Sequence, residues 1–139
     1  MKLTILQRNI EWANPALNVQ RADEAINRNP GSDLYVLPEM FSTGFCTNPE
    51  GVAESTESDT LQWMKDKAAA IDAAIAGSVA VTQDGKYYNR FYFVKPDGEV
   101  TWYDKKHLFT YGGEHKRFTA GTERVVVEWR GVRILLEVC

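Results

Sequence analysis

The stretch that decides the fold is DLYVLPEMF, which occupies residues 33–41. Its first part, residues 33–37, is a compact and mostly apolar run that stops at Pro38, which is typical of a strand buried on both faces of a sheet. Glu39 follows directly, so its carboxylate is expected to lie on a rigid and weakly solvating scaffold, where it could act as a general base. The alternative interpretation is a solvated glutamate that begins a loop.

A strand and a helix precede this run. Residues 2–7 alternate between apolar and polar side chains and predict a short strand. Residues 15–28 carry apolar side chains near helical spacing, after the good N-cap residue Asn14 and before the helix-ending pair Pro30-Gly31. The chain is therefore predicted to open with strand, helix and strand.

The remainder of the chain predicts a second helix and a set of antiparallel strands. A polar loop at residues 47–59 leads into a helical stripe from Leu61 to Ile71. Asp-Gly turns separate a meander of strands, and a hairpin ends the chain; the predicted strands span residues 75–82, 87–94, 100–103, 124–129 and 132–138. Helices that alternate with strands and then give way to a meander predict a mixed α/β sheet with helices on one face. Because residues 34–37 and 134–138 look apolar on both sides, we expect a second sheet to cover the other face.

Composition narrows the class of protein. The 139 residues carry a formal net charge of −3, which argues against a nucleic-acid partner. With 44% hydrophobic and 25% charged residues, the chain has the average composition of a soluble domain, and one domain is expected. Its two cysteines fit a reducing compartment, and no apolar run approaches the roughly 18 residues of a membrane span. These features predict a cytoplasmic protein without a membrane partner.

A basic run follows the predicted strand at residues 100–103. Lys105, Lys106 and His107 lie between aromatic and apolar neighbours. In an extended segment, residues 105 and 107 share one side and residue 106 faces away, so Lys105 is the lysine that could point inward. The alternative is an ordinary solvated charged face.

Two more residues could take part in chemistry. Glu114 lies in GGEH at residues 112–115, where glycines let the backbone pass close to other groups, although an ordinary turn glutamate would look the same. Cys139 follows the apolar run of the last predicted strand, where cysteines are usually inert core residues. A nucleophilic thiol needs a base and a positive charge nearby, and Glu39 and Lys105 could supply them.

Taken together, these segments resemble the signature segments of the nitrilase, or carbon-nitrogen hydrolase, superfamily, in the same order along the whole chain. The matching stretches are DLYVLPEMF at 33–41, YDKKHLF at 103–109 and the strand that runs into Val138-Cys139. The resemblance implies that Glu39, Lys105 and Cys139 are a catalytic Glu-Lys-Cys triad. It also implies that Glu114, seven residues before Gly121, is the further glutamate of the family.

The stretch MFSTGF at residues 40–45 is most similar to the omega-amidase branch. The branch implies hydrolysis of the terminal amide of a 2-oxo-dicarboxylic acid monoamide with water, through a thioester and with release of ammonia. The resemblance further implies a homodimer, no metal or organic cofactor, and a four-layer αββα sandwich of which residues 1–139 are the N-terminal portion. Candidates to contact the substrate are Phe41, Phe45, Arg90, Lys106 and Arg117.

Several alternatives stay open from the sequence. Glu137 stands where an omega-amidase usually has Gln, and a carboxylate there could disfavour the Cys139 thiolate, as in a catalytically silent homologue that serves as a binding or scaffold protein. A related amidase, nitrilase or N-carbamoyl hydrolase is a second possibility. A metal site is a third, although the spacing of its ligands would match no familiar zinc pattern; they would be Cys46, His107, His115 and Cys139. Because half a sandwich leaves one sheet face bare, the natural chain is expected to continue past Cys139.

Overall fold

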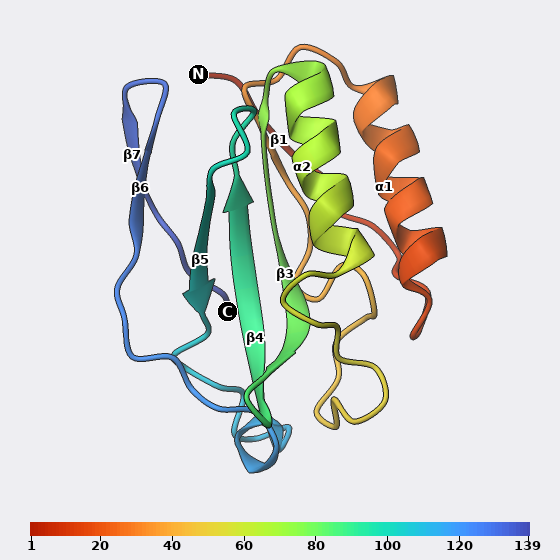
Figure 1. Ribbon diagram of the computed structural model, residues 1–139, viewed down its shortest axis with the longest axis vertical. Coiled ribbons are helices and arrows are strands. Elements are labelled where there is room, and N and C mark those ends of the chain that lie inside the picture. The colour runs from red at the N-terminus through yellow and green to blue at the C-terminus, as the bar shows by residue number, and fades with distance from the viewer.

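The computed structural model describes residues 1–139 and consists of two helices, a five-stranded sheet and a two-stranded hairpin (Figure 1). The elements are β1 (Leu3–Ile5), α1 (Pro15–Arg28), β2 (Leu34–Val36), α2 (Asp59–Ile71), β3 (Ala74–Gln83), β4 (Lys86–Val94), β5 (Val100–Asp104), the 3-10 turn η1 (Glu114–Lys116), β6 (Val126–Trp129) and β7 (Val132–Leu135). The strands of the large sheet lie in the order β1-β2-β3-β4-β5. β1, β2 and β3 are parallel, and β3, β4 and β5 are antiparallel, which confirms the predicted mixed α/β sheet.

Both helices begin at a capping side chain. Asn14 accepts a hydrogen bond from Leu17 N at 3.1 Å, and Ser58 accepts one from Leu61 N at 3.2 Å. α1 has the predicted bounds, whereas α2 begins at Asp59, ahead of the predicted Leu61. Neither helix is long and apolar enough to cross a membrane.

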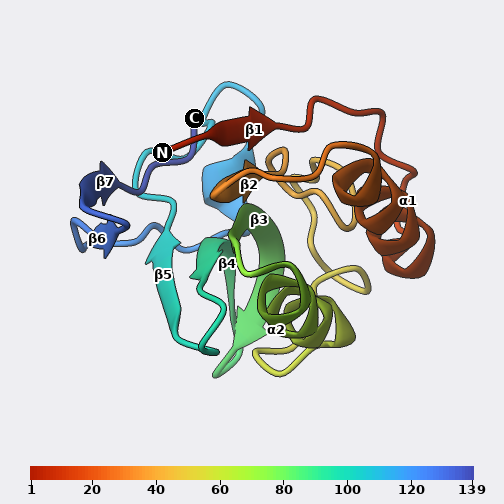
Figure 2. The same cartoon turned by 90° about the horizontal axis from the view of Figure 1, so that it is seen from above.

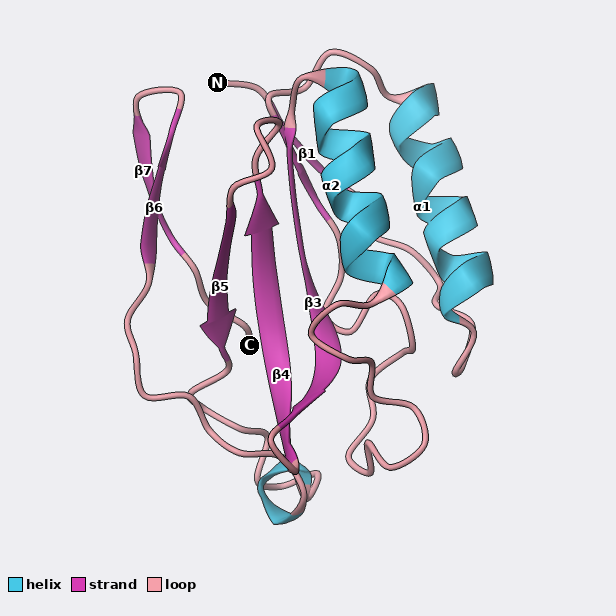
Figure 3. Cartoon of the chain, viewed as in Figure 1, coloured by secondary structure: helices cyan, strands magenta, loops and turns pink.

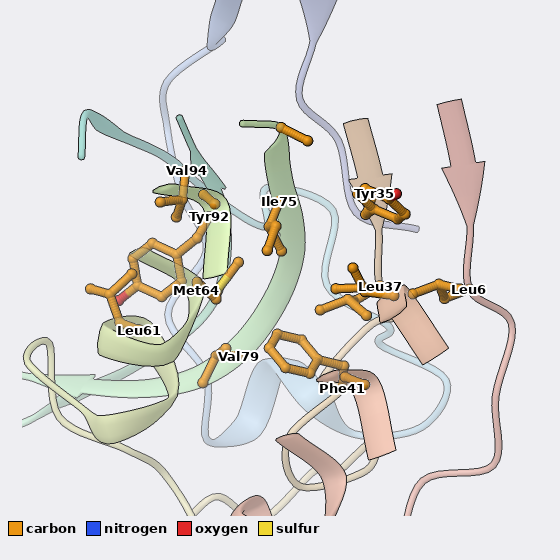
Figure 4. Packing of buried hydrophobic residues seen from close by; sticks show 14 of the residues in the cluster. Leu6, Tyr35, Leu37, Phe41, Leu61, Met64, Ile75, Val79, Tyr92 and Val94 are labelled. Carbon is orange, nitrogen blue, oxygen red and sulfur yellow. The ribbon is translucent and has the colours of Figure 1, made fainter. Parts of the chain in front are cut away.

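The main core lies between the helices and one face of the sheet (Figure 4). α1 contributes Ala22 and Ile26, which are almost completely buried, and α2 contributes Met64 and Ala68. These side chains pack on aromatic and branched residues of the sheet and its connections, among them Tyr35, Leu37, Phe41, Ile75, Val79, Tyr92 and Val94. The two helices therefore cover only one face of the sheet.

The β6–β7 hairpin lies on the side of the sheet away from the helices (Figure 2), and a smaller core packs between the hairpin and this face. The β6–β7 hairpin and the tail after it place Val127, Leu136 and Val138 against this face. In β2, Leu34 and Tyr35 point to opposite faces and both are only 2% exposed, which confirms that this strand is buried on both sides. A second sheet does cover part of the other face, as expected, but it is only a two-stranded hairpin.

The last strand is shorter than predicted. β7 ends at Leu135 rather than at residue 138, and residues 136–139 form no strand. Leu136 and Val138 are buried whereas Glu137 is exposed, so this segment buries one side and the expectation of a strand that is apolar on both sides is wrong. The tail nevertheless continues from the hairpin toward the end of β5. Figure 3 shows the long connection from β5 to β6, which is loop apart from η1.

Candidate active site

Glu39 is held in place by contacts of its neighbours with β3. Leu37 N donates a hydrogen bond to Ala76 O at 2.7 Å, and Met40 N donates one to Ser78 Oγ at 2.8 Å. Met40 adopts a left-handed backbone conformation with φ +47°, which turns the chain sharply directly after Glu39. The glutamate therefore projects from a short segment that is anchored on both sides.

Lys105 lies directly after β5 and is anchored through its own backbone. Its N–H donates to Asn89 O at 2.8 Å, and its carbonyl accepts from Gly121 N at 3.0 Å. A Cβ atom at Gly121 would lie 2.1 Å from Asp104 O, so only glycine lets the returning loop approach so closely. These contacts direct a lysine side chain that is only 1% exposed.

The Lys105 ammonium lies between two carboxylates. Nζ donates a hydrogen bond to Glu39 Oε1 at 2.8 Å and forms an ion pair with Glu114 Oε2 at 3.0 Å. Burial by itself would lower the pKa of Lys105, but the hydrogen bonds and charges of Glu39 and Glu114 outweigh burial and raise the pKa above its usual value. The lysine therefore stays positively charged inside the protein.

Glu114 is the completely buried partner of this lysine. Its side chain is 0% exposed, and its Oε2 also accepts a hydrogen bond from Phe109 N at 2.6 Å. Its backbone N–H donates in turn to Phe109 O at 3.2 Å, which closes a tight loop at η1. Glu114 is therefore not the solvated turn residue of the alternative interpretation.

Asn89 joins the same cluster, and sequence reasoning did not assign it to the site. Its Nδ2 donates to Glu39 Oε1 at 2.7 Å and lies 3.2 Å from Glu114 Oε1. One signal was available: asparagine is disfavoured in strands, and this one interrupts the aromatic stretch of β4.

A cavity of about 460 Å³ opens onto this cluster. Cys139 is exposed and lines the same cavity as Glu39 and Lys105. Buried Val138 anchors the tail that brings the cysteine there. The other lining residues come mainly from the segment after β5; they are Phe45, His107, Leu108, Phe109, Thr110 and Tyr111.

Glu39 has one carboxylate oxygen available for chemistry. Its Oε1 accepts from both Lys105 and Asn89, while no protein group donates to its Oε2. The side chain is 29% exposed, in contrast to the fully buried Glu114. The arrangement thus offers a free carboxylate oxygen, a fixed cation and a thiol around one cavity.

Of the predicted substrate contacts, Phe45 lies at this cavity. Lys105 Nζ lies 5.6 Å from the centre of its ring, and the ring packs edge-on against Phe109 at 6.2 Å between centroids. Lys106 is exposed and does not line the cavity; its backbone N–H donates to Tyr103 Oη at 3.0 Å. The structure therefore places Lys105 inward and Lys106 outward.

The structure does not bring the other predicted contacts to this cavity. Phe41 is 1% exposed and packs in the helix-side core, beside the Trp63 ring. Arg90 forms a two-bond ion pair with Asp104, at 2.7 and 3.0 Å, in a separate pocket. Arg117 is exposed at the end of η1 and lines none of the cavity.

Glu137 is engaged by a tyrosine. Tyr103 Oη donates to Glu137 Oε2 at 2.9 Å while it accepts from Lys106 N. Burial, followed by the nearby Glu137 carboxylate, raises the pKa of the tyrosine, so its hydroxyl keeps the proton that it donates. This hydrogen bond ties the tail that carries Cys139 to the segment that carries Lys105.

The four residues of the alternative metal site do not form one cluster, although His107 and Cys139 line the same cavity. The structure contains no group of three or more His, Cys, Asp or Glu side chains that could hold a metal ion. Cys46 is buried with its Sγ 3.8 Å from Met40 Sδ. Burial and, to a smaller extent, the charge of Glu114 raise the pKa of Cys46 to about 11, which marks it as an inert core thiol.

Known proteins match this chain along almost its whole length. Residues 2–139 match the carbon-nitrogen hydrolase family. The chain is 44% identical over 140 residues to the omega-amidase YafV of Escherichia coli, covering 100% of this chain and 54% of the relative. It is 34% identical over 139 residues to the 2-oxoglutaramate amidase of Bacillus subtilis, covering 96% of this chain and 54% of the relative. The chain thus spans about half the length of the curated relatives it matches.

The fold is shared with solved structures. A carbon-nitrogen hydrolase superfamily protein of Xanthomonas campestris, solved with an arsenic adduct in its active site, matches with a TM-score of 0.96 and 38% identity. The match covers 100% of this chain and 53% of that protein. The mixed α/β architecture expected from the sequence is therefore that of the nitrilase superfamily, over about half of its length.

Proposed function

This chain belongs to the carbon-nitrogen hydrolase family, and we propose on this premise that the protein hydrolyses the terminal amide of a 2-oxo-dicarboxylic acid monoamide and releases ammonia. The observation that carries the proposal is the placement of Glu39, Lys105 and Cys139 around one cavity, with the lysine charged and buried. Similarity to an omega-amidase and to a 2-oxoglutaramate amidase supports the substrate class.

The first step forms a covalent bond to the substrate. Glu39 takes the thiol proton, and the Cys139 sulfur attacks the carbonyl carbon of the amide. Negative charge then develops on the carbonyl oxygen, and the fixed ammonium of Lys105 stabilises it. Because Lys105 is already held by two carboxylates, little reorganisation is needed as this charge appears.

The second step releases ammonia. Glu39 returns its proton to the amide nitrogen, the C–N bond breaks, and an acyl thioester remains on Cys139. Protonation by a carboxylic acid makes nitrogen a competent leaving group, so this step draws only on side chains of the cluster.

The third step hydrolyses the thioester. Glu39, ionised again, takes a proton from water, and the resulting hydroxide attacks the thioester carbonyl. The tetrahedral species collapses, the C–S bond breaks, and the thiolate is reprotonated from Glu39. Glu114 takes no proton in this mechanism. It holds the Lys105 ammonium in place each time negative charge develops on the carbonyl oxygen, first during attack by sulfur and then during attack by hydroxide.

The cavity wall suits the carbon chain of a small acyl group. Phe45 and Phe109 pack edge-on, and Phe109 lies 6.0 Å from Tyr111 between ring centroids, which gives a continuous aromatic surface beside Lys105. We propose that this surface contacts the acyl chain, with Phe45 as the contact nearest the reacting carbonyl. Lys106 and Arg117 are less suited to bind the carboxylate of the substrate, at the end away from the amide, because neither residue lines the cavity.

We also propose a domain organisation, an oligomeric state and a cellular location for the whole protein. Residues 1–139 are proposed to be the N-terminal portion of one hydrolase domain, since they correspond to about half of each curated relative. A homodimer is proposed on the family resemblance. A reducing cytoplasm is proposed because the mechanism needs a free thiol, and both cysteines are free.

Ammonia release from several substrates tests the proposal. The purified full-length protein should release ammonia from 2-oxoglutaramate faster than from a nitrile, and faster than it hydrolyses an N-carbamoyl amino acid. Glu39→Gln and Cys139→Ala should each abolish release with the fold intact, whereas Cys46→Ala, a matched change of a thiol outside the cavity, should not. A clear preference for a nitrile or a carbamoyl substrate would contradict the omega-amidase assignment and leave the family assignment standing.

A further inference from the structure

We propose that Asn89 is a positioning residue for the reaction, one that orients the two carboxylates on either side of Lys105. The inference rests on the proposed function and adds a residue to it. Asn89 Nδ2 carries two hydrogens, and two carboxylate oxygens accept from it, Glu39 Oε1 at 2.7 Å and Glu114 Oε1 at 3.2 Å. One neutral amide group thus spans the two acids.

The orientation of the amide is determined by its surroundings. With its oxygen turned toward the carboxylates, Asn89 would place three acceptors together with no proton between them. The NH₂ group must therefore face Glu39 and Glu114, and Oδ1 must face the protein interior. There Oδ1 is buried, and no protein group donates a hydrogen bond to it.

This unpaired oxygen indicates why the residue is there. A buried acceptor without a partner destabilises the folded protein, and the Asn89 side chain is 0% exposed. An apolar side chain of similar size would avoid that penalty. The gain that offsets it is the pair of hydrogen bonds to Glu39 and Glu114, so the amide acts on the cluster rather than on stability.

Asn89 also holds the third member of the cluster. Its backbone carbonyl accepts from Lys105 N at 2.8 Å, so one residue of β4 contacts the lysine and both of its carboxylate partners. By donating to Glu39 Oε1, the amide fixes the rotation of that carboxylate and leaves Oε2 as the oxygen free to take the Cys139 proton. Loss of the Asn89 amide also removes a hydrogen-bond donor that stabilises the ionised Glu39 carboxylate.

The test compares Asn89→Leu with a matched variant of the same strand in the full-length protein. Asn89→Leu is expected to lower kcat for 2-oxoglutaramate by about 10- to 100-fold, with a much smaller change in KM, because ground-state binding does not use the amide. The acidic limb of its kcat–pH profile should move to higher pH. Tyr92→Leu, on the helix-packed face of β4, should lower Tm and leave the pH profile in place.

A second readout requires no substrate. The rate at which iodoacetamide alkylates Cys139 reports how readily the thiol loses its proton, and Asn89→Leu should slow it severalfold near neutral pH while Tyr92→Leu does not. If Asn89→Leu does not fold, Asn89→Ala is judged by the same two readouts.

The outcomes separate the two proposals. Unchanged kcat, pH profile and alkylation rate in the Asn89 variant would overturn the positioning role, whatever the substrate. If the wild-type protein releases no ammonia from 2-oxoglutaramate but its alkylation rate depends on Asn89, the substrate proposal fails and the positioning role stands. Effects equal to those of Tyr92→Leu would identify Asn89 as a residue of general structural importance and would also overturn the inference.

Discussion

Lys105 Nζ and Glu114 Oε2 lie 3.0 Å apart, and their side chains are 1% and 0% exposed. An ion pair so completely withdrawn from water gains little over an apolar pair, because both charges lose their hydration. Its members nevertheless depend strongly on each other: without Glu114 the buried lysine keeps only Glu39 as an ion-pair partner, and without Lys105 the buried Glu114 carboxylate has no cation beside it. Glu39, the more exposed partner of the same lysine, lines the cavity, where its carboxylate can contact a substrate.

Removal of Glu114 should therefore destabilise the protein strongly. We expect Glu114→Ala to lower the free energy of unfolding by about 3 kcal/mol, the usual effect of breaking a buried ion pair. Urea unfolding of the full-length protein measures this. An effect below about 1 kcal/mol, as for an exposed pair, would show that the pair is solvated.

Adjacent lysines should behave differently. Lys105→Ala is expected to abolish ammonia release, because no other cation lies between Glu39 and Glu114. Lys106→Ala, the matched control, should retain most of the activity, since its side chain is exposed and outside the cavity. The reverse result, with Lys106 essential and Lys105 dispensable, would invert the assignment of the two side chains.

Stability should decrease in alkaline solution because of Lys105. The carboxylates raise the pKa of this lysine in the folded protein, so its charged form contributes stability that is fully present below the unfolded pKa of about 10.4. That contribution is lost as the pH rises through the higher folded value. Above about pH 10, Tm should fall more steeply with rising pH for the wild-type protein than for Lys105→Met. Parallel curves would contradict the expected coupling.

The cysteines should differ in reactivity. The pKa of Cys46 is raised to about 11, so at about pH 8 only about one Cys46 side chain in a thousand is ionised. Cys139 is exposed beside Lys105 in the cavity and should react first with iodoacetamide. Peptide mapping after partial alkylation locates the label. Predominant labelling of Cys46 would contradict the assignment of Cys139 as the accessible thiol.

Elements with a local signal were predictable from the sequence. α1 has its predicted bounds because Asn14 caps it and Pro15 follows at the first helical position. Alternation of side chains allowed Lys105 to point inward, and the resemblance of residues 103–109 to the family selected it over Lys106. Both features depend on neighbours in sequence alone.

Features that depend on pairing were not predictable. The tail after Leu135 alternates buried and exposed side chains as a strand does, but only backbone hydrogen bonds distinguish a strand from an extended tail. Arg90 was considered a substrate contact, yet its partner Asp104 lies opposite it on β5, and that register is not visible in sequence. Asn89 matches the family's hairpin in sequence, but its place in the site was not predictable because its two acidic partners come from distant segments.

In the proposed mechanism, Cys139 carries the acyl group during hydrolysis of an amide. Quenching the full-length protein with acid during turnover of 2-oxoglutaramate, followed by mass analysis of its peptides, tests this directly. The proposed mechanism predicts an acyl adduct on the peptide that contains Cys139, its accumulation in proportion to the ammonia released in the first turnover, and its absence from Cys139→Ala. Ammonia release without an adduct on Cys139, and with activity retained by Cys139→Ala, would contradict it.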